Sequence, residues 1–257
     1  MKQKYKDLVE VAAQAGIILL ESHAESYRVE DTVRRMLSTS GLSKIDVIST
    51  STGLFITLDD VSTQVEPYTI VKRITKRDNH LNKIYRVNNI SRALVDGDIT
   101  VKDAANQLQL IDDCERSVIY KDIGTIMLAA GFAILLGGNF WEFLISIIAG
   151  ASIVLSKYGE KALQLNSFFA TMFATMFMTL IVNSIVSFVP DYVQSDIIII
   201  SSLMPLFPGM AFTNGLRDTL KGDYISGLAR ITDAFVIAVS IAIGVAMGLA
   251  IYTGVLC

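Results

Sequence analysis

The stretch DCERSVIYKDIGTIMLAAGFAILLG, residues 113–137, decides the fold, because the chain changes solvent within it. Before this stretch, charged and apolar residues alternate as they do in a water-soluble domain. From Ile119 to Cys257 nearly every residue is apolar, and the few charges stand in short clusters. The overall contents of 18% charged and 52% hydrophobic residues therefore describe neither half. We expect a soluble domain over residues 1–118, followed by a helical membrane domain over residues 119–257.

The composition argues against several classes of function. The formal net charge is −3, and no basic stripe with interleaved aromatic residues is present, so nucleic acid is not an expected partner. The cysteines, Cys114 and Cys257, lie on opposite sides of the composition change, and neither histidine has Cys or His neighbours at ligand spacing. We therefore expect no disulfide framework, no metal site and no cofactor.

The soluble half shows first a helical and then a strand-like hydrophobic period. Residues 4–22 carry an apolar face at helical spacing, formed by Leu8, Val11, Ala12, Ala15, Ile18 and Leu19. This face favours an amphipathic helix over the signal peptide that the preceding lysines suggest. A second helix is expected at 29–38, where charged residues offer i,i+3 and i,i+4 pairs. Two more are expected at 81–95 and 100–111, the last with a Thr100–Asp103 capping box.

Three β-rich runs lie between these helices. Residues 47–50 and 54–58 flank a hairpin turn at 51–53, and a third strand is expected at 68–75. The predicted fold class of the first half is therefore α+β with a small antiparallel sheet. It contains no phosphate-binding, dinucleotide-binding, zinc-protease or serine-hydrolase motif, which argues against an enzyme.

Five apolar segments of the second half are candidates for membrane spans. They cover 119–137, 140–156, 167–189, 196–212 and 228–256. Lys and Arg occur in the second and fourth connections between these segments, but not in the first, the third or the C-terminal tail. By the positive-inside rule, this alternation predicts five spans, a cytoplasmic N-terminal domain and an external C-terminus in an inner-membrane protein.

The fourth segment contains Pro205, Pro208 and Gly209 within a short apolar run. Each proline removes a backbone donor and clashes with the preceding turn, so a broken helix is expected. Short, Pro/Gly-interrupted spans are the best sequence indication of a transporter's substrate site. The alternative is a simple packing kink.

The spans also contain two polar residues in apolar surroundings and one pattern of two glycines. Asn183 lies in the third span and Asp233 early in the fifth, where it forms either a helical salt pair with Arg230 or a functional site. The Gly244–Gly248 pattern predicts close packing between helices.

Several stretches resemble the signatures of one family, the threonine/serine exporters. Residues 24–32 read AESYRVEDT, similar to the family's AETYRVEDT, and residues 135–138 read LLGG, similar to its LFGG. LMPLFPG at 203–209, TNGLRD at 213–218 and GDYISGLAR at 222–230 resemble its MPLVPG, TN(A/G)(V/I)RD and GDYxSGxAR. The resemblance covers nearly the whole chain. His23 stands where the family has a small residue, often Gly.

The resemblance implies a secondary exporter of small polar carboxylates, either amino acids of the threonine/serine type or dicarboxylates of the succinate type. Full-length members carry ten spans, whereas split members combine a soluble domain and five spans with a second small membrane protein. The length and the odd number of spans here resemble the split form. That form implies a partner subunit of five spans and an oligomeric assembly.

The leading hypothesis places a substrate site at the broken fourth span, where freed backbone N–H groups suit a carboxylate. Arg217 would bind the carboxylate bidentately at the cytoplasmic mouth, and Asp218 or Asp233 would carry a proton if export is proton-coupled. The predicted substrate-binding residues are Asn183, Ser201, Ser202, Pro205, Pro208, Gly209, Asn214, Arg217, Asp218 and Asp233.

Two other functions stay open at this point. The chain is either a regulatory or assembly subunit without its own substrate site, or a membrane-tethered hydrolase that uses Ser49–Ser51 with His80 or Glu25. The hydrolase is the weaker alternative, because an anchor needs one span rather than five.

Overall fold

The computed structural model describes residues 2–60, 67–75, 78–112, 118–189 and 193–256. The chain divides into two compact units. The first unit comprises Met1–Glu115 and Gly209–Thr232, and the second comprises Arg116–Pro208 and Asp233–Cys257. Helices dominate, and one small antiparallel sheet is present, as the sequence predicts.

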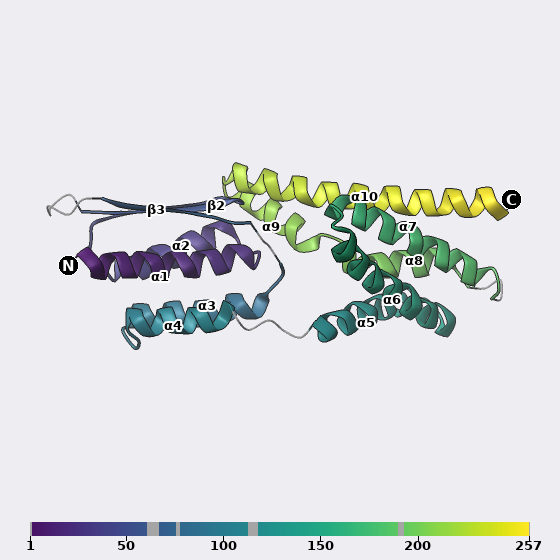
Figure 1. The fold of residues 1–257 in the computed structure, drawn as a ribbon, viewed down its shortest axis with the longest axis horizontal. Coiled ribbons are helices and arrows are strands. Elements are labelled where there is room, and N and C mark those ends of the chain that lie inside the picture. The colour runs from purple at the N-terminus through teal and green to yellow at the C-terminus, as the bar shows by residue number, and fades with distance from the viewer. Residues whose placement is uncertain (1, 61–66, 76–77, 113–117, 190–192, 257) are drawn as a thin grey trace. The chain divides into compact units, whose positions relative to one another are not determined.

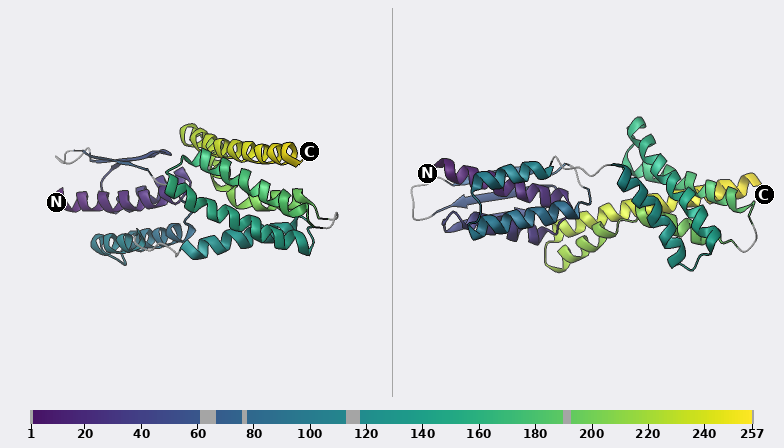
Figure 2. Two further views of the ribbon diagram at one scale, coloured as in Figure 1. Left: turned by 45° about the vertical axis from the view of Figure 1, so that its right-hand side comes forward. Right: turned by 90° about the horizontal axis from the view of Figure 1, so that it is seen from below.

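The first unit is built in three layers (Figure 1). The sheet has the order β1-β2-β3, from β1 (Lys44–Ser49), β2 (Gly53–Asp59) and β3 (Tyr68–Arg73), all antiparallel. One face of the sheet is covered by α1 (Lys2–Glu21) and α2 (Ser26–Ser38). Beyond these lie α3 (Leu81–Asp96) and α4 (Val101–Asp112), an arrangement that Figure 2 shows from two further sides.

Helix α1 lies in the middle layer and is buried on nearly all sides. Every residue of its predicted apolar face is buried, which confirms the amphipathic helix. Val9, Ala13 and Leu20 are buried as well. The reason is that α3 and α4 cover the side of α1 that faces away from the sheet.

Helix α4 begins with the predicted capping box. Asp103 N donates to Thr100 Oγ1 at 3.2 Å, and Thr100 N donates to Asp103 Oδ2 at the same distance. The Thr100 hydroxyl also donates to this carboxylate, which holds the pKa of Asp103 below its ordinary value. Two of the orphan amides at this helix start are thereby satisfied.

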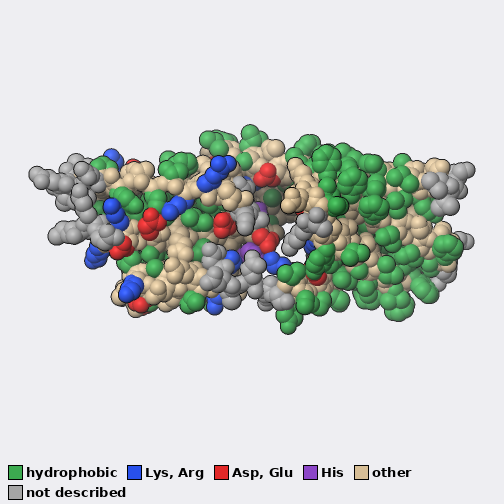
Figure 3. Space-filling view, viewed as in Figure 1, with side chains coloured by type: hydrophobic (Ala, Val, Ile, Leu, Met, Phe, Trp, Pro, Cys, Tyr) green, Lys and Arg blue, Asp and Glu red, His purple; other side chains and the backbone are tan. Residues whose placement is uncertain are grey.

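The second unit contains α5 (Val118–Leu135), α6 (Phe140–Leu163), α7 (Ser167–Val186), α8 (Ser195–Leu203) and the 3₁₀ turn η1 (Met204–Leu206). It also contains most of α10 (Tyr224–Leu256). In the described part of the chain, α5, α6, α7 and α10 are long and apolar enough to cross a membrane. Helix α8 with η1 and α9 (Gly209–Leu220) adds a fifth span if this interrupted pair is counted as one. Apolar side chains cover the visible surface of this unit, as expected of a lipid-facing bundle (Figure 3).

Two glycines allow α10 to pack closely on α7. A Cβ on Gly244 would overlap Thr175 and the Met172 carbonyl, and a Cβ on Gly248 would lie 2.8 Å from the Met176 carbonyl oxygen. Any larger residue would push the helices apart. The predicted role of this G-x-x-x-G pattern in helix packing is therefore supported by the structure.

Glu142 is a buried carboxylate in the second unit whose role the sequence did not indicate. Its Oε2 accepts a hydrogen bond from Asn139 N at 2.8 Å, completing a capping box at the start of α6. Its Oε1 accepts from Gln194 N at 2.9 Å. The side chain thus joins the start of α6 to the start of α8.

The chain reverses between α1 and α2 at His23, whose φ of 62° lies in the left-handed region. The tight turn is therefore present although the residue is not glycine. We expect His23→Val to lower the free energy of unfolding by roughly 1–2 kcal/mol, because a β-branched residue is strained in this conformation. His23→Gly, which removes the strain, should unfold at or above the wild-type temperature. Equal losses in both variants, measured by thermal unfolding in detergent, would assign the effect to the imidazole and not to the backbone.

Candidate functional site

A buried polar cluster lies in the first unit, where three of the sequence signatures meet. The turn before α2 supplies one signature, α9 supplies the second and the start of α10 supplies the third. We use the term buried polar cluster for Glu25, Ser26, Asn214, Arg217, Asp218 and Arg230. The turn before α2 forms hydrogen bonds with residues of α9 and α10 that lie 191 to 206 positions later in the sequence.

Asp218 occupies the centre of this cluster and is only 1% exposed. Its Oδ1 accepts from Ser26 N at 3.3 Å, and its Oδ2 accepts from Ser26 Oγ at 3.2 Å. The same carboxylate lies 3.2 Å from Arg230 Nε in a buried ion pair. Because a buried charge is tolerated only when it is paired and hydrogen-bonded, this network accounts for Asp218.

The turn at His23 depends on side chains from α9 and α10. Asn214 Nδ2 donates to the His23 carbonyl at 2.8 Å, and Arg230 Nη2 donates to the Ala24 carbonyl at 2.8 Å. Without these donors, two backbone acceptors of a tight turn would have to find other partners.

Glu25 is shared between two arginines. One carboxylate oxygen pairs with Arg217 Nη1, and the other lies 3.2 Å from Arg28 Nε. Glu25 is nearly buried, whereas 54% of the Arg217 side chain is exposed. Arg28 also donates to Tyr27 Oη, and this bond together with Lys221 lowers the pKa of that tyrosine. The exposed guanidinium of Arg217 is the part of the cluster that a solute can reach.

Glycines allow α9 and α10 to cross at short range beside the cluster. A Cβ on Gly215 would lie 3.0 Å from the Gly227 carbonyl oxygen, and a Cβ on Gly227 would overlap Thr219. The turn between the helices ends with Gly222 at φ 90°, after which Asp223 accepts from Ser226 N at 3.3 Å. The glycines of these two signatures therefore serve packing.

The structure brings together three of the predicted site residues, Asn214, Arg217 and Asp218. Gly209 opens α9 in the same unit. The others belong to the second unit, where Asp233 is an exposed residue of α10. The remaining predicted residues of that unit are Asn183, Ser201, Ser202, Pro205 and Pro208.

The fourth span is broken where the prolines predict it. Helix α8 ends at Leu203, and Phe207 is extended (φ −64°, ψ 128°), as a residue before proline tends to be. The turn is tightened by 3₁₀ bonds from Met204 N to Ser201 O and from Phe207 N to Met204 O. These bonds give the carbonyls of Ser201 and Met204 new partners in place of the donors that the prolines lack.

The polar side chains near the break differ in whether they have hydrogen-bond partners. Ser201 Oγ donates to the Ile198 carbonyl at 3.0 Å and lies 3.1 Å from Ser146 Oγ. Asn183 Nδ2 donates to the Thr179 carbonyl of its own helix at 2.9 Å. Ser202 Oγ is fully buried and has no hydrogen-bond partner among the described residues. Its hydroxyl is therefore a buried hydrogen-bond donor that no described residue uses.

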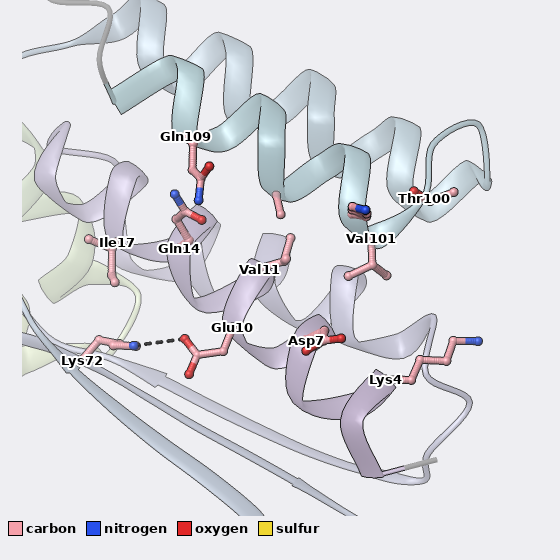
Figure 4. Close-up of a pocket in the computed structure, with 12 residues that line it drawn as sticks. Lys4, Asp7, Glu10, Val11, Gln14, Ile17, Lys72, Thr100, Val101 and Gln109 are labelled. Atoms are coloured by element: carbon pink, nitrogen blue, oxygen red, sulfur yellow. Dashed lines mark ion pairs between the residues drawn. The ribbon is translucent and has the colours of Figure 1, made fainter.

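A cavity of about 990 Å³ lies in the first unit between α1, β3 and α4 (Figure 4). Gln14 and Gln109 point toward each other across it, and Glu10 forms an ion pair of 3.1 Å with Lys72. Its walls combine apolar residues with charges of both signs. This mixture favours no single chemical class of ligand.

The buried ion pair yields a stability prediction. We expect Asp218→Ala to lower the free energy of unfolding by about 3–5 kcal/mol, because the buried Arg230 would lose the carboxylate that neutralises its charge. Asp31→Asn, which breaks the exposed Asp31–Arg35 pair, should cost no more than about 1 kcal/mol. Thermal unfolding of Asp218→Ala, Arg230→Met and the double variant checks the pairing. Strictly additive losses would show that the two side chains are not coupled.

Comparison with known proteins extends this description. The family model for threonine/serine exporters, ThrE, matches residues 10–252. The threonine/serine exporter of Corynebacterium glutamicum is 24% identical over 255 residues, which cover 94% of this chain and 50% of that protein. The chain thus spans about half the length of this curated relative. The search of solved structures finds no significant match.

Proposed function

Because the chain belongs to the threonine/serine exporter family, we propose that it exports small polar carboxylates, either amino acids of the threonine/serine type or dicarboxylates of the succinate type. Membership of an exporter family and several apolar helices indicate a multi-pass protein of the inner membrane. We assign residues 1–118 to a cytoplasmic domain and the C-terminus to the outside, on the alternation of basic residues between spans.

The observation that carries this proposal is the unpartnered Ser202 hydroxyl beside the break in the fourth span. A buried hydroxyl without a partner costs free energy, in the range of about 1–3 kcal/mol. A substrate carboxylate at this position would accept the missing hydrogen bond. Broken helices at membrane depth are tolerated where they line a cavity, which agrees with a transport path here.

The test is efflux by Ser202→Ala at equal membrane abundance. A hydrogen bond to a charged group contributes about 1.5–3 kcal/mol, so the internal substrate concentration for half-maximal efflux should rise at least about tenfold. Ser240→Ala is the matched control, because this buried hydroxyl already donates to the Ile237 carbonyl at 2.7 Å. Efflux by Ser202→Ala that matches the control would remove Ser202 from the substrate site.

The other predicted residues take different roles in this proposal. Asn183, Ser201, Pro205, Pro208 and Gly209 shape the broken span and its surroundings. In the first unit, Arg217 binds the substrate carboxylate from the cytoplasm in competition with Glu25, and Asn214 holds the turn at His23. Asp218, which pairs with Arg230 and accepts from Ser26, or Asp233 on α10 carries the proton if export is proton-coupled.

We also propose a second membrane subunit. The Corynebacterium glutamicum relative supports this proposal, because the present chain matches only 50% of its length. Efflux of labelled serine, threonine and succinate should be compared in cells that express this chain alone and together with a small membrane protein encoded beside it. Efflux that requires both proteins would support the split assembly, whereas full efflux by this chain alone would refute it.

A further inference from the structure

A small polar cleft of about 390 Å³ lies between α2 and α3 in the first unit. Helix α2 contributes Arg28, Thr32 and Arg35, and helix α3 contributes Asn88, Ser91 and Arg92. The spacings are i, i+4, i+7 on α2 and i, i+3, i+4 on α3, so each set forms one stripe of its helix. Three guanidinium groups and several neutral polar groups thus open on one cavity. We propose that this cleft binds a compact anion with at least two negative charges, such as a phosphate or a small dicarboxylate.

The guanidinium groups of the cleft offer donors to such an anion. The lining holds three arginines and two aspartates, Asp31 and Asp96, and Glu25 outside the lining pairs with Arg28. Asp31 is already paired with Arg35 at 2.9 Å. Arg92 forms no ion pair with any described residue and is exposed. Because a guanidinium presents a rigid fork of donors, it binds phosphate and carboxylate groups bidentately.

The size of the cleft limits the ligand. Pockets for small ligands span about 300–1,000 Å³, and this cleft lies near the lower end of that range. The side chains of Arg28 and Arg35 are 62% and 70% exposed, so they can turn toward a bound anion. The cleft therefore suits a ligand of a few heavy atoms more readily than a nucleotide.

The cleft is connected to the buried polar cluster through Glu25. Arg28 lines the cleft and pairs with one oxygen of Glu25, whose other oxygen pairs with Arg217. An anion that binds Arg28 in place of Glu25 breaks the Arg28–Glu25 ion pair. Glu25 then pairs with Arg217 alone. If Arg217 receives substrate, as the proposed function holds, the bound anion makes Arg217 less available and weakens export.

The first test is binding of inorganic phosphate and of succinate to the purified full-length chain in detergent. Isothermal titration at constant ionic strength should show saturable binding of a divalent anion and none of acetate or chloride. Arg92→Gln and Arg35→Gln should each weaken it at least about tenfold, which corresponds to 1.4 kcal/mol, and Arg92→Lys should weaken it less. Each variant is first checked for wild-type thermal unfolding without ligand.

Two matched controls keep the assignment specific. Arg34→Gln removes an exposed arginine of α2 outside the cleft, and Lys102→Gln removes a cation from the cavity of Figure 4. Both should bind like the wild type. Absence of saturable binding, an equal loss in Arg34→Gln, or a loss in Lys102→Gln alone would each overturn the site.

The link to export is tested separately. Internal phosphate should raise the substrate concentration for half-maximal efflux in the wild type and not in Arg92→Gln. Binding is measured without transport, so its failure is distinguishable from failure of the proposed function. Intact binding with unchanged efflux would overturn the regulatory role alone.

Discussion

The buried ion pair between Asp218 and Arg230 is the interaction on which the attachment of α9 and the start of α10 to the turn before α2 depends. Both side chains are almost fully removed from water, and such a pair is favourable only when further hydrogen bonds satisfy its remaining donors and acceptors. Three such bonds come from the Ser26 amide, the Ser26 hydroxyl and the Ala24 carbonyl, in a turn almost 200 residues earlier in the chain. The ion pair therefore fixes the position of α9 and the start of α10 against the turn between α1 and α2.

Close approach of helix backbones is the second constraint. Gly215 and Gly227 permit the crossing of α9 and α10 that brings Asp218 within reach of Arg230, and a side chain at either position would separate them. In the second unit, Gly244 and Gly248 permit the same kind of approach between α10 and α7. Helix α10 runs unbroken from Tyr224 to Leu256 and contributes residues to both units. One helix thus carries both the charged pairing and the membrane packing.

Local patterns in the sequence predicted the elements well, because their causes are local. The apolar face of α1, the hairpin of β1 and β2, the Thr100–Asp103 box and the break before Pro208 each depend on residues within a few positions of one another. Burial of Val9 and Ala13 was not predictable in this way, since it depends on which helices cover α1 from the far side.

The candidate site was predictable only in part, for the same physical reason. Asn214, Arg217 and Asp218 could be singled out as polar residues after an apolar run, but their partners are set by tertiary packing. Sequence reasoning named Asp218 or Asp233 as a proton carrier if export is proton-coupled, and it missed Ser26 as the hydrogen-bond donor to Asp218. It gave Glu142 no role, although this carboxylate joins two helix starts. For Asp218 a signal was available: Ser26 and Asp218 stand in separate signatures of one family, which would have suggested contact between the signatures.

Glu25 shows how a structural cluster can also respond to solutes. A carboxylate shared by two guanidinium groups is held by both, and each arginine is weakened as a ligand for anything else. Since Arg28 and Arg217 are both more than half exposed, each can exchange Glu25 for an external anion at little cost in desolvation. The exchange at one arginine strengthens the hold of Glu25 on the other. Competition for a single nearly buried carboxylate would thus be sufficient to couple anion binding at Arg28 with anion binding at Arg217, without any change of fold.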